Sequence, residues 1–249
     1  MHKLETQNIT MRFGSETIIR NISIYVDQGE LVSLLGVSGS GKTTLFNCIS
    51  GIYEPSGGKV ILDGNDITGS TGKISYMLQK DLLLPYKTIE DNACLPLVIR
   101  GMSKEEARRT AASYFAEFGL EGAQKKYPGQ LSGGMRQRAA FLRTYLFSDN
   151  IALLDEPFSA LDTITKGRMQ RWYLDVMEKI NLTTLFITHD INEAILLSDR
   201  VYIMTGKPGE ITSEIRIDTP RGEREGYDLS DEFMEYKRKI IAILNEQAQ

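Results

Sequence analysis

The sequence predicts an α/β fold with a mainly parallel sheet, an N-terminal antiparallel β part and an inserted block of helices. Compact apolar runs at 31–35 and 151–154 are typical of buried strands, and helical stretches separate such runs. The opening residues read as short strands instead, whereas the middle of the chain changes to helical spacing. Alternation of strands and helices implies a parallel sheet covered by helices.

The first third of the chain contains the predicted β part and the first strand–helix unit. Strands are expected at 4–10, 18–26, 31–35, 59–62 and 74–78. The helical pattern at 43–50 is stopped by Gly51. The run at 31–35 leads directly into a glycine-rich segment, so a strand, a loop and a helix follow one another there.

The middle block, 88–149, is expected to form a helical subdomain inside a core made of 1–87 and 150–249, all within one domain, 1–249. Ser103 and Glu106 have the spacing of a capping box, and the helix behind them should close at Gly119. A second helix is expected at 132–147. Strands should return at 151–154, 184–188 and 201–204, before a closing amphipathic helix at 230–246 whose apolar side is expected to pack.

Composition excludes several classes of protein. The 249 residues are 41% apolar and 25% charged, which is ordinary for a globular chain with a real core. The formal charge of −4 lacks the basic excess of nucleic-acid binders, so no nucleic-acid partner is expected. The chain has no apolar run long enough to span a bilayer and no secretory signal at its start, so a cytoplasmic protein is expected.

Cysteine and histidine are scarce. Two cysteines, Cys48 and Cys94, make neither a disulfide framework nor a metal-ligand pair, and both are expected to be small buried core residues. The two histidines, His2 and His189, make a zinc site an unfavourable interpretation.

The segment from Gly36 to Thr43 matches the phosphate-loop pattern G-x-x-x-x-G-K-[ST]. Glycines let successive backbone N–H groups turn inward, and the following helix adds the positive end of its dipole. Lys42 brings a charge to the phosphates, and the Thr43 hydroxyl can bind Mg²⁺. A plain glycine-rich turn is the alternative. The candidate ATP-binding residues here are Gly36, Val37, Ser38, Gly39, Ser40, Gly41, Lys42, Thr43 and Thr44.

Two acids, Asp155 and Glu156, end the apolar run at 151–154. Buried strands rarely finish in paired carboxylates unless charge is needed there. Asp155 is expected to hold Mg²⁺, directly or through water, and Glu156 to polarise the attacking water as a general base. With the phosphate loop, this pattern predicts a nucleoside triphosphatase.

The sequence Leu-Ser-Gly-Gly at 131–134, which continues to Arg138, resembles the signature of the ABC ATP-binding subunits. In physical terms it is a second phosphate cradle at a helix start, made by Ser132, Gly133 and Gly134. A serine cap with flexible glycines is the alternative for this segment in isolation. The resemblance covers nearly the whole chain and implies a P-loop NTPase core of the RecA-like type.

The resemblance also assigns roles to single residues. Gln79 is similar to the family's glutamine that senses Mg²⁺ and the permease, and His189 to the histidine that contacts the γ-phosphate. Asp162 ends the 159–162 segment, which resembles the family's D-loop. Phe13 takes the position of the aromatic that stacks on adenine, where the family commonly has Tyr; burial of Phe13 is the alternative.

The same resemblance implies partners. Two copies would pack head to tail, with each ATP between the 36–43 loop of one and the 132–134 turn of the other. Separate transmembrane permease subunits would contact the region from Gln79 to Asp91, where the apolar cluster at 82–86 is either an exposed partner site or locally buried. A solute-binding protein would complete the complex, which places the chain on the inner face of the cell membrane.

Three functions remain open at this stage. Phe158, the 198–201 segment and the Pro208–Gly209 pair resemble importers of the nitrate, sulfonate and taurine type, whose substrates include thiamine-precursor-like molecules; that pair is equally a simple turn. The second function is an ATPase of an exporter or lipoprotein-release system. The third is a soluble ABC ATPase with no role in transport.

Overall fold

The computed structural model describes residues 1–148, 150–224 and 226–246. The chain forms two compact units, one made of 1–74 with 182–249 and one made of 75–181. The predicted helical block, 88–149, falls inside the second unit, which also contains β7 (Ser75–Met77), β8 (Ile151–Asp155) and α5 (Thr163–Ile180). These bounds differ from those of the predicted subdomain, which stays a prediction.

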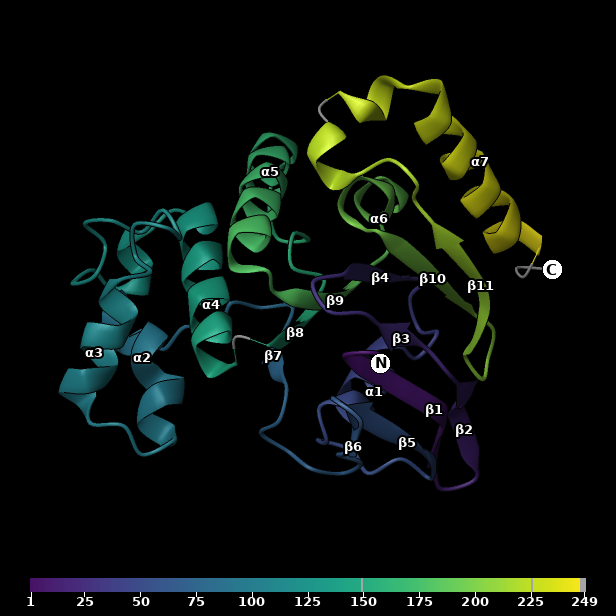
Figure 1. Ribbon diagram of the computed structural model, residues 1–249, viewed down its shortest axis with the longest axis horizontal. Coiled ribbons are helices and arrows are strands. Elements are labelled where there is room, and N and C mark those ends of the chain that lie inside the picture. Colours follow the sequence, from purple (N-terminus) through teal and green to yellow (C-terminus); the bar gives the residue numbers. More distant parts are fainter. Residues whose placement is uncertain (149, 225, 247–249) are drawn as a thin grey trace. The chain divides into compact units, whose positions relative to one another are not determined.

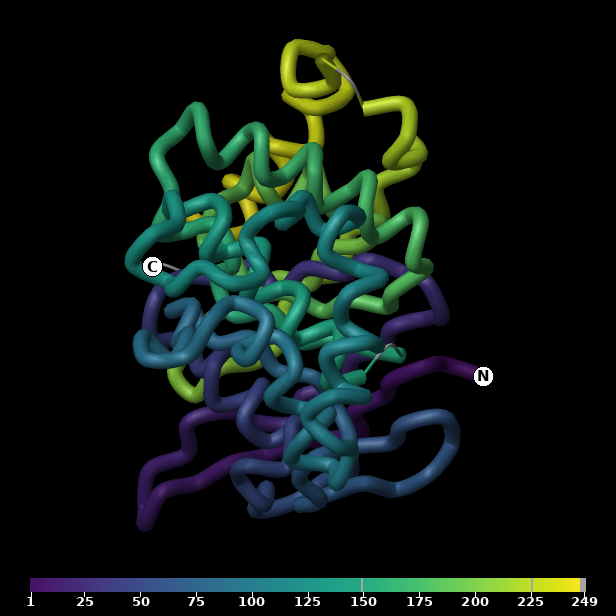
Figure 2. Tube along the Cα trace, turned by 90° about the vertical axis from the view of Figure 1, so that its left-hand side faces the viewer, coloured from purple at the N-terminus to yellow at the C-terminus, as the bar shows by residue number. Residues whose placement is uncertain are grey.

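The first unit opens with an antiparallel β sheet, as the sequence predicts. Its order is β2-β1-β5-β6, and β3 also pairs with β1. The strands β1 and β2, purple in Figure 2, run side by side as a hairpin. The members are β1 (Leu4–Phe13), β2 (Glu16–Ile22), β3 (Tyr25–Val26), β5 (Gly57–Leu62) and β6 (Asn65–Asp66).

Mainly parallel strands make the rest of the first unit's β structure (Figure 1). The strand β4 (Leu31–Leu35) lies between β9 (Thr183–Thr188) and β10 (Arg200–Thr205), parallel to both. The strand β11 (Glu210–Arg216) is antiparallel to β10. Since Pro208 and Gly209 lie between these two strands, the turn interpretation of that pair is confirmed.

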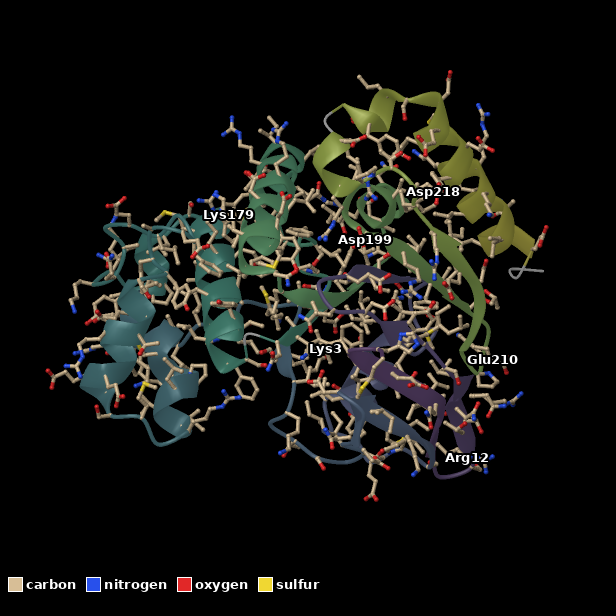
Figure 3. All side chains as sticks on the ribbon, in the orientation of Figure 1. Lys3, Arg12, Lys179, Asp199, Glu210 and Asp218 are labelled. Atoms are coloured by element: carbon tan, nitrogen blue, oxygen red, sulfur yellow. The ribbon has the colours of Figure 1, made fainter. Side chains whose placement is uncertain are left out.

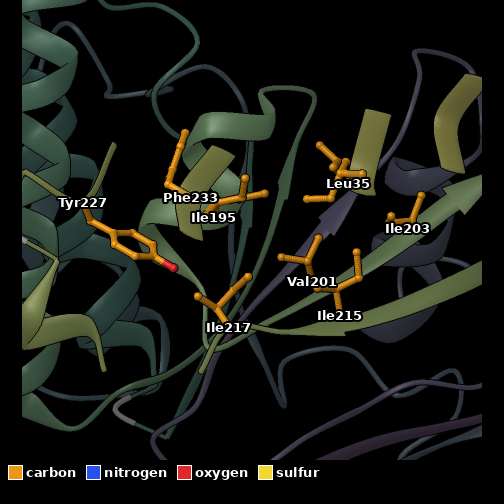
Figure 4. Close-up of a cluster of buried hydrophobic side chains, with 10 residues drawn as sticks. Leu35, Ile195, Val201, Ile203, Ile215, Ile217, Tyr227 and Phe233 are labelled. Atoms are coloured by element: carbon orange, nitrogen blue, oxygen red, sulfur yellow. The ribbon is translucent and has the colours of Figure 1, made fainter. Parts of the chain in front are cut away.

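The first unit also contains helices and 3₁₀ turns, several of which pack on a buried apolar cluster. They are α1 (Lys42–Ile49), α6 (Ile191–Leu197), α7 (Asp231–Glu246) and the 3₁₀ turns η2 (Arg221–Glu223) and η3 (Tyr227–Leu229). Figure 4 shows the cluster, in which Ile195 of α6 and Phe233 of α7 meet Leu35 and Val201 of the strands. Ile240 of α7 is buried, in agreement with the expected packing of the helix's apolar side, but Ile241 is 38% exposed.

Polar contacts fasten the C-terminal segment to the same unit. Asp199, labelled in Figure 3, accepts the backbone N–H of Leu31 at 2.9 Å and pairs with Arg221 at 3.1 Å. The buried Arg224 guanidinium donates to the carbonyls of Ile195 and Ser198 at the end of α6. These bonds satisfy carbonyls that the end of a helix leaves without partners.

The second unit contains the parallel pair β7 (Ser75–Met77) and β8 (Ile151–Asp155) and most of the long helices. The helices are α2 (Ile89–Ile99), α3 (Lys104–Ala112), α4 (Gly133–Phe147) and α5 (Thr163–Ile180), with the 3₁₀ turn η1 (Pro128–Gln130) before α4. The start of α4 agrees with the predicted helix, because the Ser132 side chain accepts the N–H of Met135 as the N-cap.

The helix predicted to run from Ser103 to Gly119 is shorter than expected. Ser103 does cap it by accepting the N–H of Glu106, but α3 ends at Ala112. There the Ser113 hydroxyl donates to the Thr110 carbonyl at 2.9 Å, a local bond that competes with helix continuation. Residues 113–119 form turns, and Gly119 closes them in the left-handed region.

Candidate functional site

The phosphate-loop segment has the predicted strand–loop–helix context in the first unit. It leaves β4 after Leu35 and enters α1 at Lys42, with Gly41 as the N-cap at φ 94°. Side chains do not fit at two of its glycines. A Cβ on Gly36 would lie 2.2 Å from the Met204 carbonyl oxygen, and one on Gly41 would lie 2.4 Å from Ile19 Cγ2. The loop's course therefore depends on these glycines.

Lys42 lies against the loop that precedes it. Its side chain is only 6% exposed, and its ammonium donates to the carbonyls of Gly36 at 2.8 Å and Val37 at 2.9 Å. A buried ammonium is costly unless polar groups surround it, so these carbonyls fix its position. The charge is thereby held at the N-terminus of α1, where anions bind.

The rest of the loop suits an anion. Val37, Ser38 and Gly39 are exposed, so their backbone is accessible at a helix start. Within the described chain, the buried Ser40 hydroxyl has no hydrogen-bond partner. A buried polar atom of this kind suits a site that binds a polyanion.

His189, the candidate for contacting the γ-phosphate, directly follows β9, the strand that neighbours β4 and the phosphate loop. Thr188 is the register partner of Leu35, so Gly36 and His189 begin at the same level of neighbouring parallel strands. The Thr188 hydroxyl donates to the buried Glu193 carboxylate at 2.6 Å and accepts the N–H of Asp190 at 3.0 Å. His189 itself is exposed.

Phe13 is 48% exposed, and its ring meets Tyr53 edge-on at 5.5 Å between centroids. The burial alternative for Phe13 is therefore wrong, and an aromatic face is available in the first unit.

In the second unit, Gln79, Glu156 and Ser159 meet at the end of β8, beside Asp155. Asp155 is 7% exposed, and Glu156 follows it with φ 46°, an uncommon conformation for a residue other than glycine. The Gln79 amide donates to the Glu156 carboxylate at 3.1 Å and approaches the Ser159 hydroxyl at 3.5 Å. Gln79, which lies just after β7, and Glu156, which directly follows β8, are thus brought together.

The signature turn and the D-loop each supply the N-cap of a helix in the second unit, Ser132 for α4 and Asp162 for α5. Ser132 and Gly133 are exposed at the start of α4. Asp162 caps α5 by accepting the N–H of Thr165 at 3.1 Å, and hydrogen bonds from the Thr165 side chain and backbone lower the pKa of Asp162. The cap interpretation of Ser132 is confirmed, and the exposed Gly133 with the partly exposed Gly134 leaves a cradle role compatible with it.

Sequence reasoning missed contacts that α4 makes with two loops. Gln137 donates to the Pro157 carbonyl, and Arg136 pairs with Asp81 at 3.3 Å. Arg143 donates to the Leu82 carbonyl at 2.8 Å. A run of polar residues on a helix gives no signal of which distant carbonyl each one binds.

The apolar cluster at 82–86 fits both alternatives, since part of it is locally buried and part of it is exposed. Leu83 is buried, while Leu82 is 51% exposed and Tyr86 is 73% exposed. Cys48 and Cys94 are buried, as predicted. Across residues 1–148, 150–224 and 226–246, no helix combines the length and apolar character that crossing a membrane requires.

Comparisons with known proteins identify the class. The profile of the ABC transporter family matches residues 19–159. The formylaminopyrimidine import ATP-binding protein ThiZ of Halalkalibacterium halodurans is 44% identical, over 94% of this chain and 93% of that protein. The nitrate import ATP-binding protein NrtD of Synechocystis sp. is 35% identical, over 93% of this chain and 89% of that protein.

Solved structures agree with these relatives. The dimeric post-hydrolysis state of the ATP-binding cassette MJ0796, bound to ADP and Pi, is 30% identical with a TM-score of 0.72, over 87% of this chain and 100% of that chain. The ATP-binding cassette MJ1267 is 25% identical with a TM-score of 0.80, over 98% of each chain.

The chain therefore belongs to the ABC transporter family. It is an ATP-binding subunit and an ATPase built on the P-loop NTPase fold, which confirms the predicted family, fold class and enzyme class.

Proposed function

We propose that this chain binds ATP with Mg²⁺, hydrolyses the ATP and thereby powers the uptake of a small solute through separate permease subunits. The observation that carries the proposal is the loop from Gly36 to Thr44, in which Lys42 is held against carbonyls at the start of α1. A helix N-terminus with a fixed ammonium and exposed backbone is suited to the β- and γ-phosphates.

The proposed roles follow each unit's own geometry and the family's motifs. In the first unit, Lys42 binds phosphate oxygens, His189 contacts the γ-phosphate and Phe13 stacks on adenine. In the second unit, Glu156 polarises the attacking water as general base, and Gln79 orients that carboxylate by its 3.1 Å hydrogen bond.

Thr43, Asp155 and Gln79 offer the oxygen atoms that Mg²⁺ prefers. When bound, Mg²⁺ would neutralise charge that develops on the phosphate oxygens. The burial of Asp155 supports this role, since it holds the carboxylate in one place at the end of β8, next to Glu156.

Two copies of the chain would share the nucleotides. Ser132, Gly133, Gly134 and Asp162 would contact the ATP bound by the other copy, and the dimeric MJ0796 cassette supports a homodimer. The exposure of Ser132 and Gly133 is compatible with an approaching ligand.

Import is favoured over export and over a role without transport by the relatives ThiZ and NrtD, which are import ATP-binding proteins. The solute would be of the nitrate, sulfonate, taurine or thiamine-precursor type. A solute-binding protein would deliver it, and the permease would contact the region from Gln79 to Asp91, where Leu82 and Tyr86 are exposed. The chain would then lie at the cytoplasmic face of the membrane.

The test is ATP hydrolysis by Lys42→Ala against wild type, with and without Mg²⁺. We expect turnover to fall by roughly 100-fold or more, because a charge aimed at the phosphates is removed. Lys59→Ala is the matched control, since Lys59 is exposed in the same unit and pairs only at the surface with Asp66. Undiminished turnover in Lys42→Ala would contradict the proposal.

A further inference from the structure

The helix α4 holds two loops of the second unit. Its arginines, Arg136 and Arg143, bind the segment that follows Gln79, at Asp81 and at the Leu82 carbonyl. Its Gln137 binds the segment that follows Glu156, at the Pro157 carbonyl. The side chains of Gln79 and Glu156 meet each other between these two attachments. One helix thus holds the segments that follow both members of this pair.

Gln137 is buried, with an exposed fraction of 5%. A buried amide needs hydrogen-bond partners, and the Pro157 carbonyl supplies one from outside the helix. Pro157 directly follows Glu156, whose backbone is in the left-handed region at φ 46°. Such a conformation persists in a residue other than glycine only when its surroundings hold it.

Aromatic packing holds the loop as well. The Phe158 side chain is 1% exposed, with its ring 6.1 Å from Phe141 of α4 and 5.8 Å from Tyr173 of α5. The backbone and hydroxyl of Ser159 both donate to the Glu156 carbonyl, at 3.2 Å and 3.0 Å. The Gln137 bond is thus a polar attachment of this loop to α4, beside the aromatic packing of Phe158.

Gln137 also lies one helical turn from the signature glycines. A Cβ on Gly133 would lie 3.8 Å from Leu161 Cδ2, and a Cβ on Gly134 would lie 3.5 Å from Thr165 Cγ2. The start of α4 therefore packs against the chain that follows the Glu156 loop, and Gln137 binds that loop directly.

We propose that Gln137 is a positioning residue for ATP hydrolysis: by holding the Pro157 carbonyl, it directs the Glu156 carboxylate toward the attacking water. This inference rests on the proposed role of Glu156 as general base. Gln137 itself touches neither nucleotide nor water in this account, and its effect passes through the backbone of the loop.

The test compares steady-state kinetics of Gln137→Met and Gln137→Glu with wild type. Met keeps the length of the side chain but cannot donate, so we expect kcat to fall roughly 10- to 100-fold, the range that a displacement of about 1 Å produces. The KM for ATP should change less than about twofold, because the phosphate loop belongs to the other unit.

Gln137→Glu adds a pH dependence of turnover, which a mere loss of packing would not produce. A protonated carboxyl donates to the Pro157 carbonyl, whereas an ionised one does not. The turnover of this variant relative to wild type should therefore rise as pH falls. A ratio that is independent of pH, together with an unchanged kcat in Gln137→Met, would overturn the inference. Should Gln137→Met fail to fold, the pH dependence of Gln137→Glu decides.

Thr144→Val is the matched control. Thr144 is equally buried in α4 and donates to the Ala140 carbonyl within the helix, so its loss should leave kcat unchanged. Glu156→Gln separates the two proposals. If that variant turns over as fast as wild type, the role of Glu156 is wrong. If it is inactive and Gln137→Met has wild-type kcat, only the inference about Gln137 fails. In the Glu156→Gln background, Gln137→Met should cause no further loss.

Discussion

The two glycine turns that open α1 and α4 look alike in sequence but differ in what requires their glycines. At the phosphate loop, a Cβ on Gly36 would lie 2.2 Å from a backbone oxygen, and Gly41 has φ 94°. At the signature turn, Gly133 begins an ordinary helix, and a Cβ there would meet Leu161 only at 3.8 Å. The chain's own fold requires glycine at the first turn but not at the second.

This difference raises the question of why glycine is nevertheless present at the signature turn. Glycine costs a helix roughly 0.5–1 kcal/mol relative to alanine, so its presence at two successive helical positions calls for another benefit. Close approach of a ligand to the backbone is such a benefit. The comparison thus supports the proposal that the signature turn receives phosphate from another copy, and the following experiments are designed to break it.

The largest effect is expected from Gly36→Ala. The new methyl group meets the Met204 carbonyl oxygen, which is backbone and cannot rotate away, so we expect a loss of about 3 kcal/mol or more. For a chain of this size that lowers Tm by roughly 6–12 °C. Thermal unfolding followed by circular dichroism measures the shift. Gly57→Ala is the control, since a Cβ at Gly57 has no atom within 4 Å in the described structure.

Gly133→Ala should show the reverse pattern. Because alanine favours helix by up to about 1 kcal/mol, Tm should stay the same or rise. Turnover of ATP should nevertheless fall roughly 10-fold or more, because the methyl group enters the cradle for phosphate. A lowered Tm with normal turnover would show that the glycine serves the fold, and the comparison would fail.

The smallest expected effect is on the reactivity of the two cysteine thiols, Cys48 in the first unit and Cys94 in the second. Burial raises the pKa of Cys48 to about 11, and burial together with the charges of Glu90 and Asp91 raises the pKa of Cys94 to about 11. At pH 8 only roughly one thiol in a thousand is then the reactive thiolate. Thiol reagents should label the native protein slowly and the urea-unfolded protein fast. Rapid labelling of a single cysteine in native protein would identify the unit that opens.

Local signals were sufficient for several elements. The strand at 31–35 was predictable because five consecutive apolar or small residues are buried on both faces. The helix α4 was predictable because Ser132 offers a cap directly before a helical pattern. The spacing from Gly36 to Thr43 identified the phosphate loop, since its glycines and Lys42 act within one short segment.

Other elements depended on contacts that no local pattern reveals. The sequence assigns 88–149 to a helical subdomain but gives no bounds for a helix at 89–99. The structure nevertheless has α2 there, capped by Thr88 and with Pro96 buried. The bond from Gln137 to Pro157 joins residues 20 positions apart, and only packing of α4 against the loop creates it.

The central claim is that phosphate cradles of two copies share each ATP, and one measurement tests it most directly. We would determine the solution mass of Glu156→Gln with and without ATP, beside the same variant carrying Gly133→Asp. The account predicts that ATP doubles the mass of the first protein, because slow hydrolysis retains the nucleotide, but not of the second, because a carboxylate at the cradle repels phosphate. Proven ATP binding with equal dimerisation of both proteins would contradict it.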